Sequence, residues 1–197
     1  MKLSRHFYFI TMKNFRKATS SDANVIAQLL MFSMEDITYD FIGLKDGDKA
    51  KQFLSELISQ ENNQYSYENA WIYEIDGKIA GTCIVYDGSL LYELRKPVLN
   101  LLLTKFNRKI NPQDETEPGE IYIDNVAIFP EFRGKGIGTE IFQFIIEEYA
   151  DKKNQTIGLL VDLNKPRAQK LYESLGFKVI GEKQLMSENH YHMQLKK

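Results

Sequence analysis

The sequence of 197 residues has one cysteine, no long apolar run and no excess of basic residues. A lone Cys83 cannot form an internal disulfide, so a reducing compartment is expected, and the cytoplasm is the default. A formal net charge of −2 argues against non-specific nucleic-acid binding, which needs a basic face. No apolar run approaches the ~20 residues of a membrane-spanning helix, and residues 7–10 are too few for a signal core. Neither nucleic acid nor a membrane is therefore expected as a partner.

Histidine is scarce as well, with three residues in the chain. His190 and His192 share one face of a predicted terminal strand, but no third ligand stands at a suitable spacing. We therefore expect no metal site and interpret this segment as a surface strand. No Ser/His/Asp or Cys/His arrangement for nucleophilic catalysis is apparent either.

The amino-acid composition is that of an ordinary globular protein, with 43% apolar and 26% charged residues. The length suits one domain, with a hydrophobic core large enough to be stable without covalent cross-links. We expect this domain to span residues 14–197 and residues 1–13 to be an appendage.

The first half of the chain shows two helices and a hairpin. N-cap residues at 20–22 precede a helix that is expected to end near Asp36, and a second amphipathic helix follows residues 46–48. Between them we expect a loop, residues 37–44, in which Tyr39, Asp40 and Phe41 either contact a substrate or simply pack. Two β-rich runs, 69–75 and 79–86, surround a turn at Asp76-Gly77.

The segment from Ser89 to Lys109 is rich in leucine and in charge, and is the least expected part of the chain. Pro97 is expected to begin a new helix in its first turn. Three roles stay open for this helical insertion: a roof over an acceptor site, a homodimer face, or plain packing. Residues 111–119 are predicted to form a polar loop.

The stretch from Gly119 to Lys153 changes its apolar period from two to 3.6 across one short turn. Residues 119–128 alternate as a strand does, and the residues from Ile137 onward repeat as a helix does. Pro130 closes the strand because it has no amide to donate. A strand, a tight loop and a long helix are therefore expected.

That loop contains Gly134, Gly136 and Gly138 together with the cations Arg133 and Lys135. Glycines at every second position leave the backbone uncovered, so successive amides can face one concavity at the positive end of the following helix. Such a concavity suits a phosphate group. The spacing fits neither the dinucleotide GxGxxG nor a Walker loop. A tight turn without a ligand is the alternative, and the two cations favour the phosphate.

Further along, residues 156–163 are predicted as a strand, and Asn164 as the cap of a helix that Gly176 ends. Two segments then resemble the motifs of the Gcn5-related N-acetyltransferase (GNAT) superfamily. The first, similar to its acetyl-CoA signature, is Val126-Ala127-Ile128-x-Pro130-x-x-Arg133-Gly134-Lys135-Gly136-Ile137-Gly138. The second, about forty residues later, is Asn164-x-x-x-Ala168-x-x-Leu171-Tyr172-x-x-x-Gly176-Phe177.

The resemblance is specific from about residue 120 to residue 177. It implies the GNAT fold, a mixed α/β sheet that is mostly antiparallel, with parallel fourth and fifth strands that splay apart and helices on both faces. It also implies acetyl-CoA as cosubstrate, with the pantetheine arm along Val126, Ala127 and Ile128. The diphosphate would bind the amides of Arg133, Gly134, Lys135, Gly136, Ile137, Gly138 and Thr139, and Asn164 would lie at the end of the fifth strand.

For catalysis, Tyr172 matches the tyrosine that protonates the departing thiolate in this superfamily, and a core tyrosine is the alternative. Alternation places Glu120, Asp124 and Val126 on one strand face. Asp124 is the candidate base or ammonium anchor, with Glu120 one repeat farther away, and a plain structural acid is the alternative. The Val126 amide would stabilise the tetrahedral oxyanion.

These features predict an acetyl-CoA-dependent N-acetyltransferase that works by direct transfer in a ternary complex, without a metal. The acceptor would be a small-molecule or peptide amine. A catalytically silent acyl-CoA-binding module is the alternative from another class.

Overall fold

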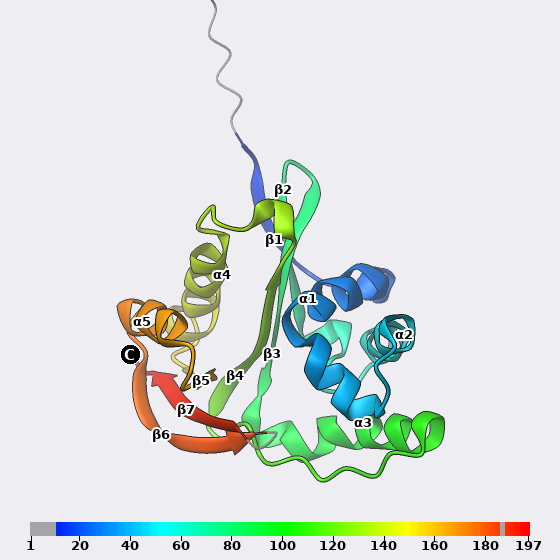
Figure 1. Ribbon diagram of the computed structural model, residues 1–197. Helices are drawn as coiled ribbons and strands as arrows, with labels where there is room; N and C mark the ends of the chain where they lie inside the picture. Colours follow the sequence, from blue (N-terminus) through cyan, green and yellow to red (C-terminus); the bar gives the residue numbers. More distant parts are fainter. Residues whose placement is uncertain (1–10, 186–187) are drawn as a thin grey trace, which may run out of the picture.

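Within residues 11–185 and 188–197, which the computed structural model describes, seven strands form one mixed sheet in the order β1-β2-β3-β4-β5-β7-β6 (Figure 1). All neighbouring strands are antiparallel except β4 and β5, which are parallel. The strands are β1 Lys13–Lys17, β2 Ala70–Ile75, β3 Lys78–Asp87, β4 Glu120–Ile128, β5 Thr156–Asp162, β6 Lys178–Leu185 and β7 Glu188–Leu195. The expected mixed α/β fold is confirmed.

Helices cover both faces of this sheet. The helices α1, α2 and α3 lie on one face, and α4 and α5 lie on the other (Figure 1). Their bounds are α1 Ala23–Ile42, α2 Gly47–Ile58, α3 Leu91–Phe106, α4 Ile137–Ile145 and α5 Pro166–Ser174, and a π-helical turn, Ile146–Asp151, continues α4. Each face has its own apolar core, so the sheet separates two buried layers.

Local sequence signals account for several elements directly. Asp76 and Gly77 both have positive φ in the β2–β3 turn (51° and 73°), as the hairpin prediction requires. Asp46 caps α2 by accepting a hydrogen bond from the Lys49 amide at 3.0 Å. The predicted apolar face of α2 is fully buried: Ala50, Phe53, Leu54, Leu57 and Ile58. Both predictions are confirmed.

The first helix is longer than expected. It continues through a kink at Met34 (φ −139°, ψ 31°) to Ile42, so residues 37–42 are helical and the predicted loop is wrong. The buried positions Met34, Thr38 and Ile42 continue at intervals of four, and Gly43 ends the helix in the left-handed region. Packing of this face against the sheet stabilises the helix beyond the kink.

Pro97 lies inside α3 instead of starting a second helix, so that prediction is also wrong. A proline inside a helix removes one backbone hydrogen bond, but the buried face of α3 runs past it without a break. That face consists of Leu91, Arg95, Val98 and Leu102. Leu90, Tyr92 and Leu103 are exposed, and a homodimer face stays one of the three roles left open for the insertion.

The described part of the chain begins at residue 11, two residues before β1. Of the predicted appendage, residues 1–13, the first ten lie outside the described residues, and β1 begins at Lys13. Within the described ranges, no helix combines the length and the apolarity that crossing a membrane requires.

Candidate active site

The glycine-rich loop follows β4 and leads into α4. Gly134 and Gly136 have φ values of 74° and 80°, a conformation that side chains with a Cβ adopt only at a cost. An added Cβ at either glycine would meet no heavy atom within 4 Å, so the backbone conformation, not crowding, requires glycine there. Gly138 lies in the first turn of α4, where an added Cβ would come 3.6 Å from Ile128 Cδ1.

Most amides of this loop face no acceptor among the described residues, but the Arg133 amide, which was expected to bind the diphosphate, donates to the Pro130 carbonyl at 3.2 Å. Among the described residues, no backbone or side-chain acceptor takes a hydrogen bond from the amides of residues 134–139, and the Glu140 amide is the first to bond, to the Gly136 carbonyl at 3.1 Å. The Arg133 Nε donates to the Ile128 carbonyl at 3.0 Å, and Lys135 Nζ to the Glu131 carbonyl at 2.9 Å. Both cations are exposed beside the positive end of α4, which favours an anion.

The strands β4 and β5 part next to this loop. Their parallel pairing ends at Ile123 opposite Leu159, whereas β5 continues to pair with β7 up to Asp162. Residues 124–128 therefore have no partner on β5. The expected splay of the two parallel strands is present, and ligands of α/β sheets collect at such openings.

A bulge in β4 places Asp124 at the opening. Ile84 and Val85 are adjacent on β3 but face Asn125 and Ile123, so Asp124 is the extra residue between them. Because the bulge reverses the alternation, Asn125 faces α1, where Ser33 Oγ donates to it at 2.9 Å, and Val126 packs into the opposite core. The expected shared face of Asp124 and Val126 is therefore wrong.

Asp124 lines a small cavity of about 110 Å³. The cavity lies on the side of the sheet covered by α1 and α3, and its lining includes Met34, Ile37, Tyr65, Tyr122 and Asn125. Burial, with a further contribution from the charge of Glu115, raises the pKa of Asp124 to about 8, and Arg95 opposes the shift. A carboxyl with such a pKa exchanges a proton near neutral pH, as a general base must.

Glu120 is in a different setting. Its carboxylate is buried and accepts hydrogen bonds from Thr116 (2.7 Å), Gln194 (2.6 Å) and His192 (2.9 Å). Burial raises the pKa of Glu120, but these hydrogen bonds outweigh that effect and lower the pKa below its ordinary value. The carboxylate is thus ionised and fully occupied by protein donors.

Tyr172 lies on α5 and packs on the face of the sheet opposite to Asp124. Its ring lies 4.9 Å from the ring of Phe142 and 6.2 Å from that of Phe177, measured between centroids. Burial raises the pKa of the phenol, so the hydroxyl stays protonated at neutral pH and can act as a proton donor.

Asn164 does not cap α5, contrary to expectation. The N-cap is Lys165, and Pro166 opens the helix. The Asp162 carboxylate accepts a hydrogen bond from the Asn164 amide at 2.7 Å, and this turn delays the helix by one residue. Gly176, with φ of 100°, follows the last turn of α5 as predicted.

A larger cleft of about 770 Å³ adjoins the small cavity, and both are lined by Met34, Ile37 and Leu185. Five carboxylates and one lysine line the cleft: Glu35, Asp36, Asp40, Asp162 and Glu188, with Lys165. Of the three residues predicted near a substrate, Asp40 lines the cleft, Phe41 lines the small cavity and Tyr39 hydrogen-bonds to Glu35 at 2.8 Å.

The two histidines of β7 have separate environments. His192 is 2% exposed and bonded to Glu120, so the surface-strand interpretation is wrong for this residue. His190 lines the acidic cleft. Within the described part of the chain, no group of three or more His, Cys, Asp or Glu side chains is placed to hold a metal ion.

Sequence reasoning missed several residues at the cavity. Arg95, Glu115 and Asn125 line it together with Asp124. Arg95 and Glu115 come from the insertion and from the polar loop after it, where a charged residue carries no positional signal. Asn125 is hidden by the bulge, since strict alternation places it on the other face.

Comparisons with known proteins agree with the fold described above. The model of the acetyltransferase (GNAT) family matches residues 36–177. A bovine thialysine N-epsilon-acetyltransferase (Bos taurus) is 42% identical over 57 residues, which span 28% of this chain and 33% of that protein.

Among solved structures, an acetyltransferase superimposes with a TM-score of 0.80 at 26% identity, covering 93% of this chain and 98% of the other. An N-acetyltransferase from Staphylococcus aureus Mu50 gives 0.79 at 22% identity, covering 92% and 100%. The aminoglycoside acetyltransferase AAC(6')-Ib, solved with coenzyme A, gives 0.60 at 18% identity, covering 94% and 95%. The chain belongs to the acetyltransferase (GNAT) family.

Proposed function

We propose that this protein transfers the acetyl group of acetyl-CoA to a cationic primary amine by direct attack in a ternary complex. The observation that carries the proposal is the run of unpartnered amides, residues 134–139 among those described, beside the opening between β4 and β5. A diphosphate accepts hydrogen bonds from such amides, and the first turn of α4 adds a favourable field. Arg133 and Lys135 supply charge at the same place.

The pantetheine arm would then follow the unpaired edge of β4 past Ile128, Ala127 and Val126, and bring the thioester to the bulge. There the Val126 amide would donate to the oxygen of the tetrahedral intermediate. A fixed donor of this kind needs no reorganisation as the negative charge develops.

The acceptor amine must lose a proton to react. With a reference pKa near ~10.4, only about one lysine-like amine in 10³ is neutral at pH 7, a cost of roughly 4–5 kcal/mol. Asp124 takes this proton from the ammonium, and the neutral nitrogen then bonds to the acetyl carbon. As the C–S bond breaks, Tyr172 gives its proton to the departing thiolate, and the second proton that the nitrogen loses restores the Tyr172 phenol. The products are an N-acetyl amine and free CoA thiol.

The acceptor enters through the acidic cleft. Five carboxylates against one lysine attract a cation. Asp162 of β5 and His190 of β7, which are register partners, both line the cleft. The thialysine acetyltransferase and the aminoglycoside acetyltransferase found as relatives act, by their names, on amine-bearing molecules. We infer a small-molecule or peptide acceptor with a primary amine.

A screen for thiol release tests the proposal. Acetyl-CoA is mixed with the protein and an aminoglycoside, a polyamine, an amino acid or a peptide N-terminus, and free thiol is measured. Release with at least one amine, and a loss of about 10²-fold in Asp124→Asn, are expected.

Calorimetry with acetyl-CoA distinguishes an active acetyltransferase from the alternative, a catalytically silent acyl-CoA-binding module. Tight binding with no thiol release from any of the four acceptor classes would instead identify a silent acyl-CoA-binding module. If acetyl-CoA does not bind, the proposed phosphate site is wrong.

A further inference from the structure

Arg95 is an unusual residue for its position on α3. Its neighbours on the buried face of that helix are the apolar Leu91, Val98 and Leu102, and Arg95 itself is only 6% exposed. A buried guanidinium is costly unless charged and polar partners compensate it. The position of Arg95 is therefore explained only by what it contacts.

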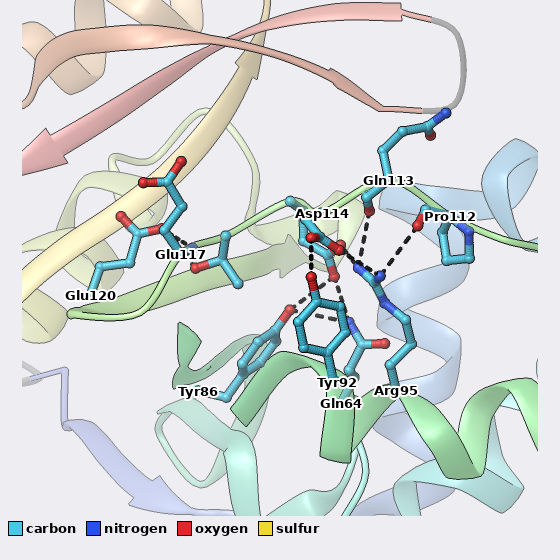
Figure 2. A network of polar contacts seen from close by, with 11 residues as sticks. Gln64, Tyr86, Tyr92, Arg95, Pro112, Gln113, Asp114, Glu117 and Glu120 are labelled. Carbon is cyan, nitrogen blue, oxygen red and sulfur yellow. Dashed lines mark hydrogen bonds and ion pairs between the residues drawn. The ribbon is translucent and has the colours of Figure 1, made fainter. Parts of the chain in front are cut away.

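Those contacts all lie on the connection between α3 and β4 (Figure 2). The guanidinium donates to the carbonyls of Pro112 (3.3 Å) and Gln113 (3.0 Å), to the Asp114 carboxylate (3.1 Å) and to the Glu115 carboxylate. One side chain of the insertion thus fastens four successive residues that have no regular secondary structure of their own.

Glu115 is held from its other side as well. It is 7% exposed, and its second oxygen accepts hydrogen bonds from Gln64 Nε2 (2.6 Å) and the Tyr86 hydroxyl (3.1 Å). Arg95 and Glu115 therefore form a buried ion pair with few alternative conformations.

This pair shares the small cavity with Asp124. Arg95, Glu115 and Asp124 all line it. The other polar groups are the amides Gln64 and Asn125 and the hydroxyls of Tyr65 and Tyr122, with Tyr86 behind Glu115. Burial raises the pKa of each of the three phenols well above its usual value, so they are neutral. The α1 helix contributes Met34, Ile37 and Phe41, and the remaining lining residues are Pro112 and Leu185.

Among the described residues that line this cavity, the charges that act on Asp124 are thus those of Arg95 and Glu115. Their effects have opposite signs, because the Glu115 anion disfavours a second anion and the Arg95 cation favours it. No described side chain donates a hydrogen bond to the Asp124 carboxylate, so charge and burial alone govern it.

We propose that Arg95 of the α3 insertion and Glu115 of the loop that follows it form a positioning pair, which acts through Asp124 and sets how readily that carboxyl takes a proton. The pair also fixes residues 112–115 as a wall of the cavity. This proposal rests on the base role of Asp124 proposed above. It assigns a function to the insertion that packing alone does not.

The test follows the Asp124 carboxyl directly, so it needs neither an acceptor nor catalytic turnover. Protein with ¹³C-labelled aspartate carboxyls is titrated by NMR, and the Asp124 signal is identified from its absence in Asp124→Asn. Glu115→Gln removes the anion and should lower the titration midpoint of Asp124 by about one pH unit. Arg95→Met removes the cation and should raise the midpoint by a similar amount.

Two further variants complete the design. Arg95→Lys keeps the charge and should keep the midpoint within about half a unit of wild type. Lys96→Met removes the next cation along α3, which is exposed and paired with Glu93, and should leave the midpoint unchanged. Thermal unfolding of each variant verifies that it is folded.

Opposite shifts in Glu115→Gln and Arg95→Met support the proposal. If Arg95→Met does not fold, Glu115→Gln decides the question. An unchanged or raised midpoint in folded Glu115→Gln would overturn the positioning role. If the midpoints shift as expected but wild-type protein releases no thiol with any amine, the pair is confirmed and the catalytic role of Asp124 is not.

Discussion

Two carboxyl groups on β4, the buried Glu120 and the half-buried Asp124, are four residues apart and in opposite states. Glu120 receives hydrogen bonds from three side chains, so its charge is stabilised and its pKa is lowered despite burial. Asp124 is half-buried in a cavity that Glu115 also lines and has no such donors, so desolvation and the Glu115 charge raise its pKa to about 8. Hydrogen-bond donors, more than burial itself, thus separate a structural acid from a candidate base.

Tyr172 is the proposed general acid, and its hydroxyl can be removed without removing its ring. Tyr172→Phe removes the hydroxyl but keeps the ring contacts with Phe142 and Phe177. We expect kcat to fall by about 10²-fold, the usual contribution of a general acid, because the thiolate then leaves without a proton. Steady-state kinetics measure kcat, and calorimetry should show acetyl-CoA affinity within about twofold of wild type.

Tyr149→Phe is the matched control for that variant. Tyr149 packs against the same core, and its hydroxyl accepts a hydrogen bond from Trp71 at 3.1 Å. Its loss should leave kcat unchanged. Equal turnover in Tyr172→Phe and wild type would remove the acid role of Tyr172.

At the scale of elements, the site is assembled where β4 ends. The bulge turns Asp124 toward one layer of helices and Val126 toward the other, and the loop of residues 133–136 then delivers the backbone to the start of α4. The proposed diphosphate binding and the proposed proton transfer to Asp124 thus belong to consecutive parts of one strand-loop-helix unit.

The conformation of this loop gives a second prediction. Gly136→Ala places a Cβ on a residue with φ of 80°, a strain of roughly 1–2 kcal/mol that a backbone shift would relieve. Because that shift moves the amides, the Kd for acetyl-CoA should rise about tenfold, which corresponds to 1.4 kcal/mol. Calorimetric titration measures the change.

Gly77→Ala provides the comparison. Gly77 has a similar φ of 73° and equally open surroundings, but lies in the β2–β3 turn. The two variants should lose similar stability, and only Gly136→Ala should lose affinity. An unchanged Kd in Gly136→Ala would mean that the amides of this loop do not bind the cosubstrate.

For the whole molecule, the sheet divides two apolar cores, and β4 and β5 part between them. The acid-lined cleft and Asp124 belong to the side of α1 and α3, whereas Tyr172 belongs to the side of α4 and α5. A ligand in the opening would contact both layers, so its binding should stabilise the fold as a unit.

A thermal-shift measurement tests this third prediction. Acetyl-CoA at about 100 times its Kd should stabilise the folded state by about 2.7 kcal/mol, which for a chain of this size raises Tm by about 5–10 °C. Pantetheine lacks the diphosphate and should give a much smaller shift at the same concentration. Equal shifts with both compounds would contradict a site built on the loop amides.

The sequence by itself determined the elements that depend on local chemistry. The hairpin at Asp76-Gly77, the capped helix α2 and the glycine loop follow from propensity, capping and period, and two motifs identified the family before any tertiary contact was known. Helix limits were less predictable: packing of Thr38 and Ile42 extended α1, and the buried face of α3 outweighed the lost hydrogen bond at Pro97.

Only the tertiary structure decided which acids share a cavity. The burial of His192 against Glu120 and the pairing of Arg95 with Glu115 join residues that are 20 or more positions apart in the sequence. The bulge at Asp124 depends on one unpaired residue between two strands. Hydrophobic period carries no information on such pairings, since it records which face a residue takes and not which charge lies opposite. The physical reason is that the proton affinity of a buried carboxyl depends on its neighbours in space.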